Sequence, residues 1–382
     1  MKKLKVLMVA GDMHVGGIEN QLMHLARNAD RSQFQIDFTS TRPDAFYREE
    51  IESLGGRFLL IPHMSLRRPW VYCAALRKVM EEGGYDVVHS HELFHSGITL
   101  WVAKLAGVPS RFVHAHNWRD DDGTGRSRGI VRSVYHGLMR FAINRCSTAQ
   151  IACSSWAGDF LYGKKMTKKD SYHLVYNSVD TGKFLERYDR QESGAFCDDG
   201  WKNVLNVARI TAVKNQLFLV EIAGELRRRG KRIRILCAGN GDKAYEAAVR
   251  QAIAEQGLEE YIRLLGVCRD IDVLARKCSA FVLPSRFEGM PLVMIEAQAA
   301  GLHCVSADTY SPEVDFGIGT VAWLPLEAGA AAWADALEAA VEAEKPEKSA
   351  VERVIQEKKF DSRMFAQTMC RLYREDVEKQ TS

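Results

Sequence analysis

Two glutamates, Glu288 and Glu296, lie eight residues apart in the apolar segment 280–301. The apolar run 280–284 predicts a buried strand, a short loop then carries Glu288, and Pro291 suits the first turn of a helix. Burying a carboxylate among apolar neighbours costs free energy unless it has a partner. Beside the N–H groups of a helix N-terminus, such a carboxylate could bind sugar hydroxyls while the N–H groups bind phosphate. The alternative is a helix-capping Glu288 and a helical Glu296 without a function.

Glycines follow two of the predicted strands. Gly16 and Gly17 open a predicted helix, where residues without a Cβ let backbone N–H groups approach an anion. A plain strand–helix turn is the alternative. Residues 239–244 fit a loose Gly-x-Gly-x-x-Ala, but the next strand ends without an acidic residue, which favours a tight turn over a dinucleotide site. The chain has no Gly-Lys-Ser/Thr, which excludes a P-loop.

Histidines mark the ends of two successive predicted strands, His89 and His91 on one, His114 and His116 on the next. Because side chains alternate along a strand, both members of each pair point to the same side. Acidic and histidine residues between 92 and 95 would allow a metal ion, but the spacing matches no zinc pattern. We therefore expect no metal, and imidazoles that donate to sugar hydroxyls or lie near an acceptor.

Short apolar runs alternate with segments of helical period along the chain. The predicted strands are 5–10, 35–41, 58–62, 86–91, 111–116, 150–154 and 173–177, and then 203–208, 233–238, 263–265, 280–284 and 304–307. Repeated strand–helix units build parallel sheets with helices on both faces. We expect an α/β protein with two doubly wound domains, 1–190 and 191–358, and a final helix in 359–382 that packs back on the first.

The composition is that of a globular protein, with 46% hydrophobic and 26% charged residues among 382. The net charge of +3 conceals a division, since residues 1–190 hold 27 Lys and Arg against 20 Asp and Glu, and the remainder 25 against 29. The nine cysteines are never spaced Cys-x-x-Cys, which favours reduced thiols in a cytoplasmic protein. No apolar stretch approaches the ~18–20 residues needed to cross a bilayer. No nucleic-acid partner is expected.

The Glu-x7-Glu segment resembles the signature of retaining glycosyltransferases of family 4, which have the GT-B fold. The likeness covers nearly the whole chain and includes residues 16–19, 86–91, 176–180, 206–209, 214–215 and 239–241. It implies two Rossmann-like domains that face an interdomain cleft. It also implies transfer of a sugar from a nucleotide-sugar donor with retained anomeric configuration, without a metal or other cofactor, and with the donor bound to the second domain.

The resemblance implies roles for individual residues of the second domain. Arg209 and Lys214 would hold the donor diphosphate, and charge-assisted contacts there would offset the charge of the leaving group. Glu288 would bind hydroxyls of the donor sugar, and Glu296 would accept from the ribose hydroxyls. The other residues assigned to the donor are Gly239, the backbone of Gly289, Met290, Pro291 and Leu292, and Arg269 and Ile271 beside the nucleobase.

In the first domain, the resemblance implies that Gly16 and Gly17 close over the phosphate and that His91 lies near the reacting centre. Two segments depart from the family pattern, and the first is Asn177-Ser178, where the family often has Asn-Gly in an interdomain turn. Residues 308–313 replace the paired glycines of many members, which leaves the role of Glu313 open and resembles transferases of exopolysaccharide and capsule assembly. Asp120–Asp122 contain an Asp-x-Asp that could hold a divalent cation, but no strand immediately precedes it, which favours a solvated loop.

Basic residues at helical spacing follow, namely Arg128, Arg132, His136 and Arg140, opposite an apolar stripe that includes Val131, Val134 and Leu138. One interpretation is a helix with its apolar side in the core and its basic side in water. The other is peripheral docking on anionic lipid at the inner face of the cytoplasmic membrane, which suits a lipid-linked acceptor. Residues 67–70 could add to that surface.

Together these features predict a retaining hexosyltransferase that moves a sugar from a nucleotide-sugar, a UDP-sugar in our interpretation, to a glycan or lipid-linked glycan. Two alternatives stay open. A sugar-nucleotide epimerase or hydrolase of the same fold would turn over the donor alone. A non-catalytic partner in an assembly complex would bind the sugar-nucleotide only, although the intact set of Glu288, Glu296, Arg209 and Lys214 argues against it.

Overall fold

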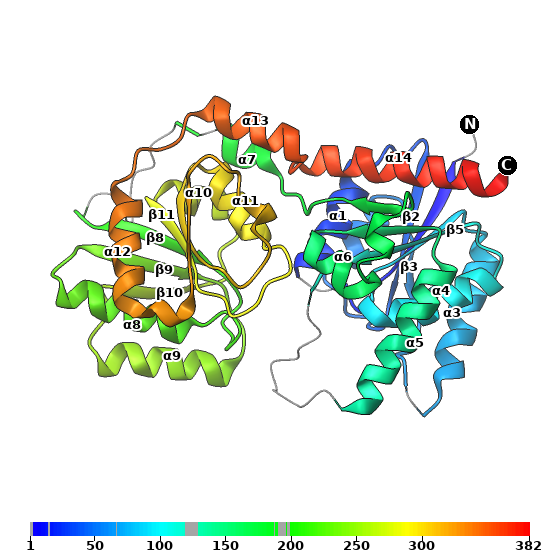
Figure 1. Ribbon diagram of the computed structural model, residues 1–382, viewed down its shortest axis with the longest axis horizontal. Coiled ribbons are helices and arrows are strands. Elements are labelled where there is room, and N and C mark those ends of the chain that lie inside the picture. The colour runs from blue at the N-terminus through cyan, green and yellow to red at the C-terminus, as the bar shows by residue number, and fades with distance from the viewer. Residues whose placement is uncertain are drawn as a thin grey trace. The chain divides into compact units, whose positions relative to one another are not determined.

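The computed structural model describes residues 3–13, 16–65, 67–118, 129–186, 188–189, 196 and 199–382. The chain forms two compact units (Figure 1). The first unit combines Met1–Val179 with Phe360–Ser382, and the second is Asp180–Lys359. The division therefore falls at Asp180, earlier than the boundary placed at residue 190 from the sequence.

A parallel sheet in the order β3-β2-β1-β4-β5-β6-β7 forms the centre of the first unit. Its strands are β1 (Leu4–Val9), β2 (Phe34–Ser40), β3 (Phe58–Leu60), β4 (Val87–Ser90), β5 (Ser110–Ala115), β6 (Ala149–Ala152) and β7 (Tyr172–Leu174). Its helices are α1 (Gly17–Asn28), α2 (Arg48–Ser53), α3 (Pro69–Gly83), α4 (Ser96–Leu105), α5 (Ile130–Cys146), α6 (Ser155–Tyr162) and α14 (Ser362–Thr381). Every strand lies where the sequence predicted one, with ends that shift by a few residues.

Both faces of this sheet are buried, because successive residues of β1 enter opposite cores. Val6 and Met8 belong to a core under α1 and α14, to which the last helix contributes Phe365 and Tyr373. Leu7 joins the opposite core, formed with α3 and α4. Parallel strands covered on both faces read as continuous apolar runs, which is the pattern of this strand in the sequence. In Figure 1, α14 runs alongside α1 within the unit.

The second unit repeats the plan with a parallel sheet in the order β10-β9-β8-β11-β12-β13. Its strands are β8 (Lys202–Val207), β9 (Ile233–Ala238), β10 (Ile262–Gly266), β11 (Ala280–Leu283), β12 (His303–Ala307) and β13 (Val321–Leu324). Its helices are α7 (Thr181–Leu185), α8 (Gln216–Arg228), α9 (Lys243–Glu255), α10 (Ile271–Arg276), α11 (Leu292–Ala299), α12 (Gly329–Glu342) and α13 (Lys348–Lys358).

The edge strand β13 was not predicted, although its four residues are all apolar, and it is only partly buried. In the described part of the chain, no helix is both long enough and apolar enough to cross a membrane.

In each unit the strands run parallel, so the loops that leave them in one direction gather at one edge of the sheet. Glu288, Lys214 and Arg209 lie in such loops of the second unit, whereas Glu296 lies within α11.

Candidate functional site

The loop after β11 places Glu288 against a lysine from the loop after β8. Glu288 Oε1 accepts hydrogen bonds from Lys214 Nζ at 2.5 Å and from Ser285 Oγ at 2.7 Å. The side chains of Lys214 and Glu288 are only 19% and 10% exposed, so the pair is held largely away from water. Ser285 is fully buried. One oxygen of the Glu288 carboxylate is therefore held by a cation and a hydroxyl together.

Backbone contacts join the two loops that carry this pair. Arg286 N donates to Val213 O at 2.8 Å, and the Arg286 guanidinium contacts Asn215 Oδ1 at 3.3 Å. Asn215 adopts the left-handed conformation, with φ of 60°, and α8 begins directly after it. Asparagine tolerates this conformation better than most residues, which accounts for its place at the turn. The turn fixes Lys214 at the start of α8, beside the neighbouring strand β11.

Arg209 lies in the loop after β8, separated from the strand by Ala208, and is exposed. Its carbonyl accepts from Gln216 Nε2 at 3.0 Å, which fixes the backbone, while its guanidinium makes no ion pair or hydrogen bond with any described residue. Next to it, the turn after β9 comes so close that a Cβ on Gly239 would lie 2.1 Å from Ala208 O. Only glycine permits this approach, at a φ of 139°. Gly239 therefore shapes the wall beside Arg209.

Glu296 lies inside α11, and its environment differs from that of Glu288. Burial raises the pKa of Glu296 to about 7, and the nearby Lys183 works in the opposite direction. Within the described ranges its carboxylate has no hydrogen-bond or ion-pair partner. Lys183 itself forms an ion pair with Asp180 at 3.5 Å. A half-buried carboxylate without a partner is able to accept from the hydroxyl groups of a ligand.

The remaining residues assigned to the donor lie at the same edge of the second sheet. The backbone of Gly289, Met290, Pro291 and Leu292 leads from Glu288 into the N-terminus of α11. Arg269 is exposed after β10, and Ile271 begins α10. Since β10, β9, β8 and β11 are neighbours in the sheet, the structure brings these loops together within one unit. Their roles toward a ligand stay predictions.

In the first unit, four buried imidazoles line one face of the sheet at the ends of β4 and β5. His91 Nδ1 and His116 Nε2 share a hydrogen bond of 2.9 Å, and His89 Nδ1 shares one of 2.6 Å with the Tyr373 hydroxyl of α14. The ring of His114 stacks on that of His116, with centroids 4.1 Å apart. All four lie on the side expected from strand alternation.

Burial lowers the pKa of His89, His91, His114 and His116, in the last to about 3, so these imidazoles are neutral at physiological pH. His89 Nε2, His91 Nε2 and both nitrogens of His114 have no hydrogen-bond partner among the described residues. Nitrogens of these three rings lie within 4.8 Å of one another, a spacing from which imidazoles could hold a metal ion.

The neighbours considered for a metal from the sequence lie elsewhere. Glu92 accepts from Thr99 Oγ1 at 2.7 Å and from the Tyr72 hydroxyl at 3.1 Å, and His95 lies edge-on against Tyr135. Asp120–Asp122 fall outside the described residues. In the first unit, Gly16 and Gly17 stand at the start of α1, as expected. Glu313 accepts from Ser311 Oγ at 2.9 Å in a short turn before β13.

Two residues of the site were not recognised from the sequence. Ser285 supports Glu288, and the only signal was its position at the end of a buried strand, three residues before the glutamate. Tyr373 lies in sequence far from His89 and meets it only because α14 returns to the first unit. No local pattern could have indicated that contact.

The interpretation that α5 turns its apolar side to the core is wrong. Val131, Val134 and Leu138 are exposed. Arg140 turns inward instead, donating from Nη2 to Phe160 O at 2.7 Å and from Nε to a second carbonyl of α6. Its assignment as a lipid contact is therefore also wrong. Arg132 is half-buried, and Arg128 lies outside the described residues.

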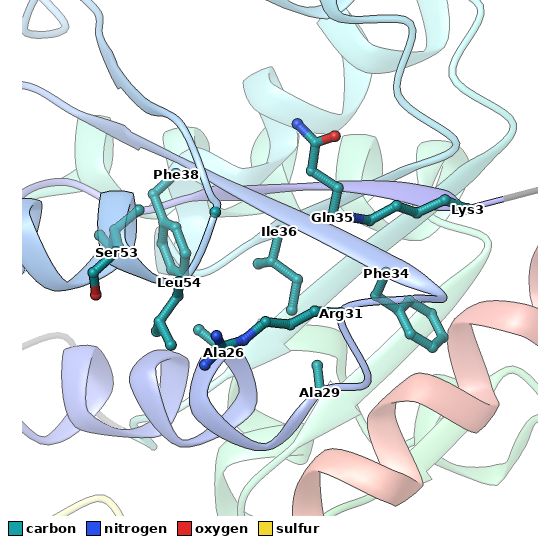
Figure 2. A pocket seen from close by; sticks show the side chains of 12 residues that line it. Lys3, Ala26, Ala29, Arg31, Phe34, Gln35, Ile36, Phe38, Ser53 and Leu54 are labelled. Carbon is teal, nitrogen blue, oxygen red and sulfur yellow. The ribbon is translucent and has the colours of Figure 1, made fainter.

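A surface pocket of the first unit lies apart from all these residues. Figure 2 shows its lining from the end of α1, the strand β2 and the helix α2, with Phe34, Ile36 and Leu54 on its apolar wall and Lys3 and Arg31 beside them. It contains none of the residues assigned to the donor or to the imidazole cluster. The site is therefore defined by the loop ends of the sheets and not by this pocket.

Both halves of the chain match known families. Residues 15–183 match the family described as Glycosyltransferase Family 4, and residues 202–343 match the family described as Glycosyl transferases group 1. The glycosyltransferase EpsF of Bacillus subtilis (strain 168) is 32% identical over 380 residues, 98% of this chain and 97% of the relative.

Two further relatives are more distant. The capsular polysaccharide biosynthesis glycosyltransferase CapH of Staphylococcus aureus is 25% identical and covers 77% of this chain and 78% of its own. A UDP-Gal:alpha-D-GlcNAc-diphosphoundecaprenol alpha-1,3-galactosyltransferase of Escherichia coli is 26% identical over 64% of each chain.

Anabaena Alr3699/HepE, solved in complex with UDP-glucose, superposes with a TM-score of 0.76 at 15% identity and covers 97% of this chain and 100% of its own. The structural likeness confirms the expected GT-B fold.

Proposed function

Since this chain belongs to glycosyltransferase family 4, we propose that it is a retaining glycosyltransferase that moves a sugar from a UDP-sugar to a lipid-linked glycan during the synthesis of a surface polysaccharide. The observation that carries this proposal is the Lys214–Glu288–Ser285 contact at the carboxyl edge of the second sheet. It combines a cation for a diphosphate with a carboxylate for sugar hydroxyls in one partly desolvated position.

The charges of this site suit a reaction in which negative charge develops on a leaving diphosphate. Lys214 and the exposed Arg209 stand at the start of α8 and the end of β8, where they can offset that charge as the glycosidic bond breaks. Glu288 contacts Lys214 and lies in the loop before α11, and from there its carboxylate would orient the donor sugar. We infer that these cations replace a metal ion in this role, so transfer should persist in a chelator.

Retention without a covalent intermediate requires attack on the same face from which the diphosphate leaves. The residue of the first unit that the resemblance assigns to the reacting centre is His91, whose imidazole hydrogen-bonds to His116. It offers no carboxylate that could act as a nucleophile. Rate enhancement would then come from positioning the acceptor hydroxyl and from stabilising the leaving group. The acceptor hydroxyl would lose its proton as the new bond forms, and the leaving diphosphate oxygen would take up that proton. The contacts of Gly16, Gly17 and His91 with the donor stay predictions.

Two relatives support the acceptor class. CapH carries the description of a capsular polysaccharide enzyme, and the galactosyltransferase of Escherichia coli carries a diphosphoundecaprenol-linked sugar in its name. The same enzyme and Alr3699/HepE are named with UDP-sugars, which supports uridine as the base of the donor. An acceptor held by a lipid would require the enzyme to work at the inner face of the cytoplasmic membrane.

A ligand screen followed by an activity assay tests the proposal. UDP should raise the Tm of the protein more than GDP or ADP, because a ligand that binds the folded state stabilises it by mass action. With donor and a lipid-linked acceptor, NMR should show a new linkage of the same anomeric configuration as the donor, in buffer with EDTA. Inversion of configuration, or turnover of donor alone with no transfer, would contradict the proposal.

A further inference from the structure

The outer side of α5 carries a row of apolar side chains in contact with water. Ile130, Val131, Val134, Leu138 and Phe141, which we call the outer α5 face, are 55–85% exposed. At 3.6 residues per turn they fall within about 100° of the helix circumference. Single exposed apolar residues are ordinary on a protein surface, but a continuous row on one helix marks an interaction surface.

The opposite side of α5 is anchored, so this orientation is not arbitrary. Arg140 donates to two carbonyls of α6 and stands over the ring of Phe94, 5.7 Å from its centroid. His136 stacks on the same ring at 4.0 Å. Rotation of the helix that buried the outer α5 face would break all of these contacts. The sequence of α5 is therefore amphipathic with its apolar side turned outward.

The adjoining helix α4 extends the apolar surface. It packs against α5 and exposes Trp101 and Leu105, each about half accessible, with Lys104 between them. Tryptophan is favoured at the boundary between lipid and water because its ring is amphipathic.

The charges around these helices select the partner. The helices α4 and α5 contain no aspartate or glutamate, and Lys104 of α4 is exposed, whereas the Arg140 guanidinium is turned inward. Arg145 is exposed and falls on the same side of α5 as the outer α5 face. An anionic surface would therefore meet no like charge on these two helices, and Lys104 and Arg145 would add attraction.

We propose that the outer α5 face docks on an anionic phospholipid bilayer, with α5 lying in the plane of the interface. The apolar side chains enter the boundary of the acyl chains, and Arg145 stays at the level of the lipid phosphates. This inference rests on the proposed function in one respect, namely that a lipid-linked acceptor would bring the protein to a membrane. This surface differs from the basic stripe predicted from the sequence. The apolar side chains of the outer α5 face make the contact with lipid, and the arginines on the opposite side of α5 do not.

Vesicle sedimentation with the full chain tests this docking. The protein should bind vesicles of phosphatidylcholine with phosphatidylglycerol more tightly than vesicles of phosphatidylcholine alone, and salt should weaken the binding. Phe141→Glu, and more strongly the double variant L138E/F141E, should reduce binding by at least about tenfold, because a carboxylate replaces an inserted side chain. The matched control is Phe46→Glu, which changes a phenylalanine of the same unit that is 65% exposed.

Three results would overturn the docking surface. The first is no binding of the wild-type chain to anionic vesicles at low salt, and the second is an equal loss in Phe46→Glu. The third is a wild-type dimer in light scattering that Phe141→Glu converts to a monomer without a change in lipid binding, which would assign the face to a second copy. The Tm shift with UDP keeps the two proposals separate, since Phe141→Glu should retain it. Lipid binding without any UDP response would leave the docking standing and contradict the proposed function.

Discussion

The loops at the ends of the two sheets carry opposite kinds of polar chemistry. In the second unit the site is charged, with Lys214 and Glu288 paired at 2.5 Å and Arg209 exposed beside them. In the first unit the corresponding strand ends carry imidazoles that burial keeps neutral, and His91 and His116 share a hydrogen bond. One fold plan therefore supports an ionic site in one unit and an uncharged one in the other.

This difference explains where the charge of the two halves resides. The positive surplus of the first half is not in its imidazole cluster but on its surface, where the helices α4 and α5 contain no acidic residue. The second half is acidic overall, yet it holds Arg209 and Lys214 at the strand ends. Net charge is a property of surfaces, whereas the chemistry of each site depends on a few groups removed from water.

The largest effect should come from removing the cation of the charged site. Lys214→Ala should lower kcat/KM by about 10²–10³, the range found when one group that stabilises developing negative charge is deleted. The variant also removes one of the two hydrogen bonds to Glu288 Oε1 and keeps the one from Ser285 Oγ. Steady-state kinetics with donor and acceptor measure the loss, with circular dichroism to verify folding.

Lys243→Ala is the matched control for this variant, because Lys243 is exposed at the start of α9 and forms no ion pair among the described residues. It should stay within about twofold of wild type, since isolated surface charges contribute little. Full activity in Lys214→Ala would contradict the contrast between a charged site and a neutral one, because the site of the second unit would then not depend on the charge of Lys214.

Acidification should change the stability of the two units in opposite directions. In the first unit, the pKa values of four buried imidazoles lie below the ordinary 6.5. The unfolded chain therefore binds more protons as the pH falls below about 6.5, and the first unit loses stability. In the second unit, Glu296 has a pKa of about 7 against 4.5 when unfolded, so the folded form takes up the proton first. Its contribution rises as the pH falls from 7 toward 4.5, by at most about 3 kcal/mol.

Hydrogen exchange separates the two responses, once the intrinsic exchange rates at pH 7 and pH 5 are divided out. Amides of β4 and β5 should lose protection at pH 5, while those of β8 and β11 should gain it. Glu296→Gln should remove the gain in the second unit, because the amide stays neutral throughout. Movement of both units in the same direction, or an unchanged gain in the variant, would show that these groups do not control the response.

The fold could be predicted largely from the sequence because its strands are buried on both faces. The runs at β1, β8 and β11 stand out as apolar segments between turns, and parallel pairing follows from the helices between them. β13 is apolar as well, but it lies partly exposed at the edge of the sheet and was not predicted. The end of the first unit at Val179 could not be read either, since it depends on which contacts the folded chain makes.

The positions of the site residues were predictable, but their contacts were not. Glu288 stood out because it follows a strand, and Lys214 was assigned through the family resemblance, yet their pairing requires two loops 74 residues apart to meet. The helical period of α5 gave its two stripes correctly. It could not give their orientation, because Phe94 and the carbonyls of α6 hold the basic side, and these partners come from other segments of the chain.

The smallest effect should come from the one hydroxyl that anchors the imidazole cluster to α14. Tyr373→Phe keeps the ring and removes only the partner of His89 Nδ1, at present 2.6 Å away in a fully buried position. An unsatisfied buried polar atom costs about 1–3 kcal/mol, so the protection of amides in β4 and β5 should fall by that amount. Tyr261→Phe is the control, because the Tyr261 ring packs on Trp201 and its hydroxyl makes no hydrogen bond with a described residue. A loss confined to the first unit would show that this cluster, although it carries no charge, depends on hydrogen bonds as the other site depends on its ion pair. Equal protection in Tyr373→Phe and Tyr261→Phe would show instead that apolar packing of α14 alone holds the imidazoles in place.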